Sequence, residues 1–216
     1  MKNGICVLVL GLGLGMAAAA GAQDTSKING DVVVAAGRTA HDVQTVNGDV
    51  HVGAKGQVDE AEAVNGSVTL DSQATARSLE TVNGDITLQQ NARVSEDVEA
   101  VNGDITLHEG ADVRGEVSNV TGLILLEAAR VGDGLETVAG DITVGAHSRV
   151  KGGIKVEKPD YHHRSHPHTP RIVIGPHAVV DGPLVFQRKV ELYVSDSAKI
   201  GPVTGATAQT FSGDRP

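Results

Sequence analysis

Aliphatic residues recur at every sixth position through most of the chain. The longest uninterrupted series is Val46, Val52, Val58, Val64, Leu70, Ala76, Val82, Leu88 and Val94. Because 40% of the residues are hydrophobic, chance would give such a series only about 3 times in 10,000 for a given starting position. A step of six matches neither the 3.6-residue period of a helix nor the two-residue period of one long strand. The rhythm therefore predicts short strands separated by corners, with the repeated aliphatic side chains pointing inward.

A longer repeat contains this rhythm. A motif of the Val-Asn-Gly-Asp type recurs with its glycine at Gly30, Gly48, Gly66, Gly84, Gly103, Gly122 and Gly140. The steps between these glycines are 18 or 19 residues. A fixed period of this length is typical of stacked repeat units, and six-residue steps divide each unit into three. The expected fold class is all-β: a single-stranded parallel β-helix, or solenoid, with about 18 residues and three short strands per coil.

The polar residues of the repeat favour stacked coils with tight corners. Ile86-Thr87-Leu88 alternates apolar and polar residues, which points two side chains inward and one outward. Glycine and asparagine tolerate positive φ, so Asn-Gly-Asp suits a sharp corner. Stacking would align Asn47, Asn65, Asn83 and Asn102, then Asp31, Asp49, Asp85, Asp104 and Asp141, and also Glu62, Glu80, Glu99 and Glu136. We expect an amide ladder and aspartates that accept backbone N–H bonds, with a bound divalent cation as the alternative for the acidic columns.

Composition and register divide the chain into five segments. We expect a signal peptide at 1–22, β-helix coils at 23–157, a His- and Pro-rich loop insertion at 158–171, C-terminal coils at 172–204 and a disordered tail at 205–216. The first segment has a basic start, an apolar run and small residues at its end, as secretory signal peptides do. The insertion holds three prolines and lacks apolar alternation. We therefore expect a periplasmic or secreted protein with no integral membrane span after cleavage.

Composition also narrows the functional classes. The net charge of -9 disfavours nucleic acid as a partner. The only cysteine, Cys6, lies in the expected signal peptide, so the exported chain would have no thiol chemistry. No nucleophile has a base at a meaningful spacing, and His177 stands alone in its repeat. We expect no enzymatic activity and no cofactor.

The loop insertion contains one candidate metal site. It comprises His162, His163, His166 and His168. Neutral imidazoles this close in sequence could share a zinc, copper or nickel ion. A polar insertion without metal explains the same residues, because no cysteine or carboxylate stands at a recognised ligand spacing.

Two motifs resemble a known family. They are Val101-Asn102-Gly103-Asp104-Ile105-Thr106-Leu107 and Ala111-Asp112-Val113-Arg114-Gly115-Glu116-Val117. Both resemble the repeats of bactofilins, polymer-forming bacterial cytoskeletal proteins, and the repeat is also similar to exported adhesin-like β-helix proteins. The bactofilin resemblance implies a right-handed β-helix that polymerises end to end without nucleotide. The six-residue spacing alone is equally typical of the left-handed hexapeptide-repeat helix.

These observations lead to one functional expectation and one alternative. We expect an exported, non-enzymatic β-solenoid that acts as a structural or self-assembling scaffold of the bacterial cell envelope. Self-association would use the terminal coils, with Phe186, Leu192 and Tyr193 near one contact, because unpaired strand edges invite pairing. The alternative is an adhesin-like surface module that binds a cell-envelope polysaccharide or divalent cations.

Overall fold

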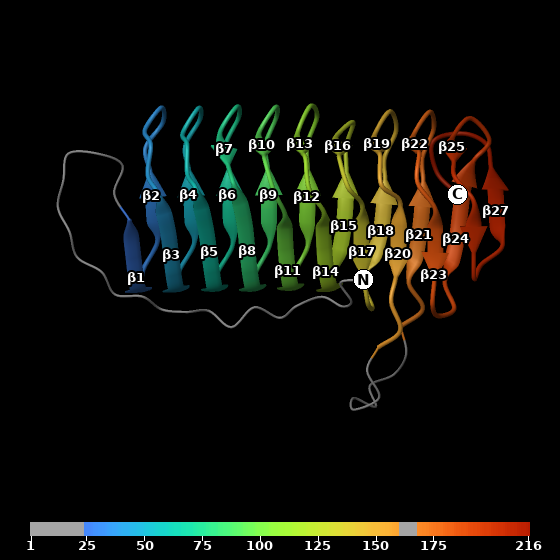
Figure 1. Ribbon diagram of the computed structural model, residues 1–216, viewed down its shortest axis with the longest axis horizontal. Coiled ribbons are helices and arrows are strands. Elements are labelled where there is room, and N and C mark those ends of the chain that lie inside the picture. The colour runs from blue at the N-terminus through green and yellow to red at the C-terminus, as the bar shows by residue number, and fades with distance from the viewer. Residues whose placement is uncertain (1–23, 160–167) are drawn as a thin grey trace.

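The computed structural model describes residues 24–159 and 168–216. They form a rod of stacked coils, in which the chain advances from β1 at one end to β27 at the other (Figure 1). The described residues contain strands and no helix, and every strand pair is parallel. The rod is therefore a β-solenoid, as the repeat predicts.

The rod has three parallel sheets, of which two run its whole described length and the third begins at β7. The first sheet comprises β1 (Thr25–Asn29), β3 (Asp42–Asn47), β5 (Glu60–Asn65), β8 (Ser78–Asn83), β11 (Val98–Asn102), β14 (Val117–Thr121), β17 (Leu135–Thr137), β20 (Ile154–Val156), β23 (Leu184–Phe186) and β26 (Val203–Thr204). The second sheet comprises β2 (Val32–Val34), β4 (Val50–Val52), β6 (Val68–Leu70), β9 (Ile86–Leu88), β12 (Ile105–Leu107), β15 (Leu123–Leu126), β18 (Asp141–Val144), β21 (Arg171–Ile174), β24 (Glu191–Ser195) and β27 (Ala208–Phe211). The third sheet comprises β7 (Thr75–Ala76), β10 (Arg93–Val94), β13 (Asp112–Val113), β16 (Arg130–Val131), β19 (Arg149–Val150), β22 (Val179–Val180) and β25 (Lys199–Ile200).

Equivalent residues of successive coils lie side by side. In the second sheet Ile86 pairs with Ile105 and Leu88 pairs with Leu107. Both positions are fully buried in these strands, and the threonine between them faces outward. The inward side chains of each coil contact those of the next coil. Stacking therefore removes one continuous column of aliphatic side chains from water. The predicted coil of about 18 residues and three strands is confirmed.

The motif valines occupy a different position from the one the six-residue rhythm predicts. Val64, Val82 and Val101 are partly exposed on the outer side of the first sheet. The inward positions of β8 are instead Leu79 and Thr81, both buried. The strand runs without interruption through Val82 to Asn83, so side-chain alternation turns the valine outward. Counting in sixes crosses a corner, where this alternation is reset.

The Asn-Gly corner ties each coil to the next through side chains. Asn65 Nδ2 donates to Asn47 Oδ1 at 3.1 Å, and Asn83 Nδ2 donates to Asn65 Oδ1 at 3.0 Å. Asp85 Oδ1 accepts the backbone N–H of the equivalent residue one coil later, Asp104, at 2.8 Å. The predicted amide ladder and the predicted backbone-capping aspartates are therefore confirmed. These bonds tie exposed polar groups of each corner to the equivalent groups of the neighbouring coil.

The insertion leaves the solenoid at this same corner. It joins β20 of the first sheet to β21 of the second sheet. Asp141 Oδ1 accepts the backbone N–H of Arg171 at 2.8 Å, although 30 residues separate them. The stacking register therefore continues across the insertion.

The expectation of a disordered tail over 205–216 is wrong for its middle part. β27 pairs with β24, with Ala208 beside Leu192 and Phe211 beside Ser195. Ala208 is partly buried and continues the inward column of the second sheet. The weak alternation of this segment hides the strand, because one small residue is enough to fill the inward position at the end of the rod.

We predict that Gly66→Ala destabilises the solenoid by at least about 2 kcal/mol, because overpacking beside a rigid backbone cannot relax. A Cβ at this position would lie 1.8 Å from the carbonyl oxygen of Gly48 in the preceding coil. Thermal unfolding followed by circular dichroism measures the effect. In the control Gly134→Ala the new Cβ meets Gly153 O at 3.2 Å, which a small shift relieves. Equal melting temperatures for the two variants would contradict the close stacking at the Asn-Gly corner.

Candidate functional site

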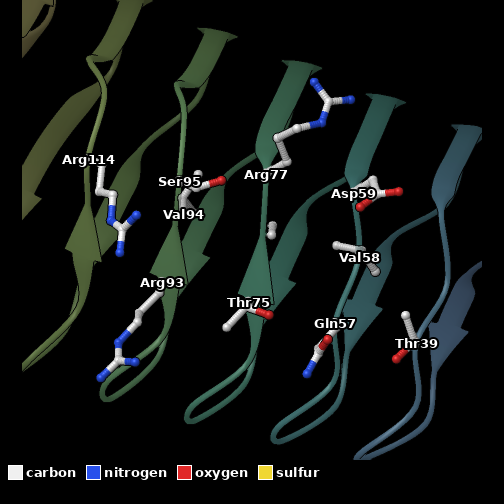
Figure 2. Close-up of a pocket in the computed structure, with 11 residues that line it drawn as sticks. Thr39, Gln57, Val58, Asp59, Thr75, Arg77, Arg93, Val94, Ser95 and Arg114 are labelled. Atoms are coloured by element: carbon white, nitrogen blue, oxygen red, sulfur yellow. The ribbon is translucent and has the colours of Figure 1, made fainter.

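A groove with a volume of about 480 Å³ runs over the third sheet and its extension toward the N-terminal coils. Its outward side chains form two rows on successive coils (Figure 2). One row is Thr39, Gln57, Thr75 and Arg93, and the other is Asp59, Arg77, Ser95 and Arg114. In each coil an outward residue of the strand supplies the first row, and the residue two positions later supplies the second row. The repeated register aligns both rows along the rod.

A second cavity of about 420 Å³ continues the groove across the neighbouring corner. It shares Gln57 and Arg93 with the first cavity and adds Lys55, Gln73 and Asn91. These last three residues adopt positive φ, between 59° and 64°, at the same point of successive coils. The continuous surface is lined by cations, amides and hydroxyl groups.

The groove is basic although the protein is acidic. Four cationic side chains line it, namely Lys55, Arg77, Arg93 and Arg114, against one carboxylate, Asp59. Asp59 Oδ2 lies 2.7 Å from His41 Nδ1, and this hydrogen bond raises the pKa of His41. The protonated form of His41 would neutralise part of the Asp59 charge.

The four cations differ in whether a carboxylate of the protein pairs with them. Arg77 lies 3.2 Å from Glu60 Oε1 and 3.3 Å from Glu96 Oε2. Within the described ranges, no carboxylate lies within 4.0 Å of Lys55, Arg93 or Arg114. Asp112 is the register neighbour of Arg93 in β13 but makes no ion pair with it. The exposed Arg93 and Arg114 guanidinium groups therefore have donors available for a ligand.

The outer side of the first sheet has the opposite character. Glu62, Glu80 and Glu99 stack in register, as predicted, and Ser118 separates them from Glu136. Glu136 is paired with Lys155 Nζ at 3.1 Å. Burial raises the pKa of Glu80 and of Glu99, and nearby carboxylates add to the effect. This face is an acidic strip whose charges repel one another along the rod.

Glu62 is the least favourable member of the acidic strip. Only 8% of its surface is exposed, and no hydrogen bond to its carboxylate is formed within the part of the chain that the structure describes. Burial raises its pKa from 4.5 to about 7, and the charges of Glu80, Glu60 and Asp42 act in the same direction. Burial likewise raises the pKa of Glu116 to about 7. Both carboxyl groups therefore hold a proton more tightly in the folded chain than in the unfolded chain.

The structure tests the histidine prediction only at one residue. His162, His163 and His166 lie outside the described residues. His168 Nε2 lies 2.8 Å from Asp141 Oδ1, and its carbonyl oxygen accepts a hydrogen bond from Arg188 at 2.7 Å. In the described ranges no group of three or more His, Cys, Asp or Glu residues could hold a metal ion. Metal binding by the full cluster stays a prediction.

His177 has a neighbour that the sequence does not reveal. Its ring stacks on that of His147, with centroids 5.2 Å apart. Over residues 24–159 and 168–216, no serine or threonine hydroxyl forms a hydrogen bond with a histidine ring. The stacked pair therefore supplies no nucleophile and base arrangement.

Sequence analysis missed the groove, although a signal for it exists. Arg93, Asp112, Arg130 and Arg149 are register partners across four coils, and Arg114 belongs to the parallel row. Aligning the chain by coil, with 18 or 19 residues per step, would have exposed these rows. The six-residue rhythm of apolar positions does not reveal these rows, because the cations stand beside the positions that define it.

We predict that Glu62→Gln stabilises the protein at pH 8 and has a much smaller effect at pH 5. A carboxyl group whose pKa is higher in the folded state lowers stability as pH rises from about 4.5 to about 7, because unfolding then releases a proton. Glutamine removes this loss. Melting temperatures at both pH values measure it, with the exposed Glu191→Gln as control. A pH-independent difference between Glu62→Gln and the parent protein would show that Glu62 does not titrate in this way.

Function has to be inferred from the geometry of the chain itself. No protein-family model, curated protein or solved structure matches the sequence or the fold. Among the described residues, no helix has the length and apolar character needed to cross a membrane. The open ends of the solenoid and the charged rows on its faces are the features from which function can be inferred.

Proposed function

We propose that this chain is an exported, non-enzymatic scaffold of the bacterial cell envelope that self-associates through a terminal coil. The solenoid supports this proposal, since among residues 24–159 and 168–216 its sheets end in strands that are paired on one side only. The signal-peptide pattern of residues 1–22 and the resemblance to bactofilin repeats support it independently. The observation that carries it is the character of the C-terminal end.

The C-terminal end of the described rod presents strand edges and partly buried apolar side chains. β25, β26 and β27 are the outermost strands of their sheets. Ile200, Val203 and Ala208 continue the inward columns there, and all three are only partly buried against the core. A second copy placed on this end would bury these side chains and pair the free strand edges.

The N-terminal end is less suited to such pairing. Lys27 of β1 occupies an inward register position, beside Thr45 of β3. Its ammonium group donates a hydrogen bond to the carbonyl oxygen of Asp31. A charge in the inward column disfavours stacking of another coil on this side. We therefore expect two copies to meet through their C-terminal ends, which gives a two-fold contact.

The predicted contact residues lie one coil further inside. Phe186 and Leu192 are 5% and 1% exposed, and the last coil covers them. Tyr193 pairs with Gln209 of β27. We therefore expect Phe186, Leu192 and Tyr193 to lie near the contact but one coil inside it, because β27 extends the stack beyond them.

We predict that residues 23–216 form dimers in sedimentation velocity at micromolar concentration, and that Val203→Lys abolishes them. The lysine places a charge in the inward column of the last coil and so reproduces the N-terminal arrangement. Val33→Lys is the control, because Val33 is 65% exposed on the outer side of the second sheet. A strictly monomeric parent chain at high micromolar concentration, or assembly unchanged by Val203→Lys, would refute the proposal.

A further inference from the structure

We infer that the groove over the third sheet binds an extended acidic polysaccharide that lies along the rod. The inference does not depend on self-association, because the groove lies on the side of the solenoid and away from the open C-terminal end. It rests on the charge of the lining, on the donors left available and on the repeat of the coils.

The available donors suit carboxylate or sulfate groups. Arg93 and Arg114 lie in different rows, are exposed and make no ion pair among the described residues. A planar guanidinium group can donate two parallel hydrogen bonds to one acidic group. Lys55 adds a third cation at the adjoining corner. An anionic ligand would therefore satisfy charges that the protein leaves unpaired.

The coil repeat favours an extended polymer over a small anion. Neighbouring strands of a sheet lie about 4.8 Å apart, so each row presents one side chain at this interval along the rod. Thr39, Gln57, Thr75 and Arg93 occupy successive steps of one row (Figure 2). A chain that lies along the row would meet hydroxyl, amide and guanidinium donors in turn, which matches alternating hydroxyl and acidic groups on sugars.

The lining argues against the other extended anion, single-stranded nucleic acid. Proteins that hold single strands stack the bases on aromatic side chains. No aromatic residue lines either cavity. A protein partner is disfavoured because the apolar residues of the lining, Val58, Ala76 and Val94, are buried in the core.

The test is a binding titration of the purified protein, by isothermal titration calorimetry, with polygalacturonate as the carboxylate polymer and dextran sulfate as the sulfated one. Unmodified dextran and a single-stranded oligodeoxynucleotide are the comparison ligands. We expect one or both acidic polysaccharides to bind, dextran not to bind, and added salt to weaken binding. The double variant Arg93→Gln/Arg114→Gln should weaken it at least about tenfold, because hydrogen bonds to charged groups are lost.

Lys189→Gln is the control. Lys189 is exposed between β23 and β24, away from the third sheet, and lies outside the lining of both cavities. Its removal changes the net charge without touching the groove, so its affinity should stay within about twofold of the parent protein. Circular dichroism of all variants confirms that the solenoid is retained.

Each remaining outcome decides against the inference. Failure of both acidic polysaccharides to bind overturns it, as does equal binding of unmodified dextran. An equal loss in the double variant and in Lys189→Gln would show that only overall charge matters. Tighter binding of the oligodeoxynucleotide would assign the groove to nucleic acid instead.

Discussion

The stacking of one coil on the next is the interaction on which this molecule depends. A single coil has no interior of its own, since its inward aliphatic side chains meet only those of its neighbours. The Asn-Gly corner sets the distance and register of that contact. Gly66 lies too close to the carbonyl of Gly48 for any side chain, and the amide of Asn65 is bonded to Asn47. Each such bond contributes little to the free energy of folding. Repeated along the rod, however, these bonds keep all the other rows of side chains in register.

Alignment of the inner columns leaves the outer rows free to carry different chemistry. The first sheet presents the stacked carboxylates of Glu62, Glu80 and Glu99, whereas the third presents the guanidinium groups of Arg93 and Arg114. Arg77 joins the two faces through its ion pairs with Glu60 and Glu96. An acidic protein can therefore contain a basic groove, because opposite charges are separated around the coil and each charge type is repeated along the rod.

The sequence predicted the coil, the three sheets and the corner bonds, because each follows from a residue type repeated at a fixed step. It misplaced Val82, since counting in sixes ignores the reset of side-chain alternation at a corner. It missed β27, whose two inward register positions hold the small Ala208 and the polar Thr210. It also missed the groove, because Arg93 and Arg114 stand 21 residues apart in different rows and come together only after folding.

The position of the insertion shows where this architecture accepts change. The chain departs after Val156 and rejoins at Arg171, whose backbone still bonds to Asp141 as if no residues had been added. Variation in length is thus absorbed at the corner between the first and second sheets, while the strands on both sides keep their register. Foreign segments grafted at this corner should therefore leave the remaining turns intact.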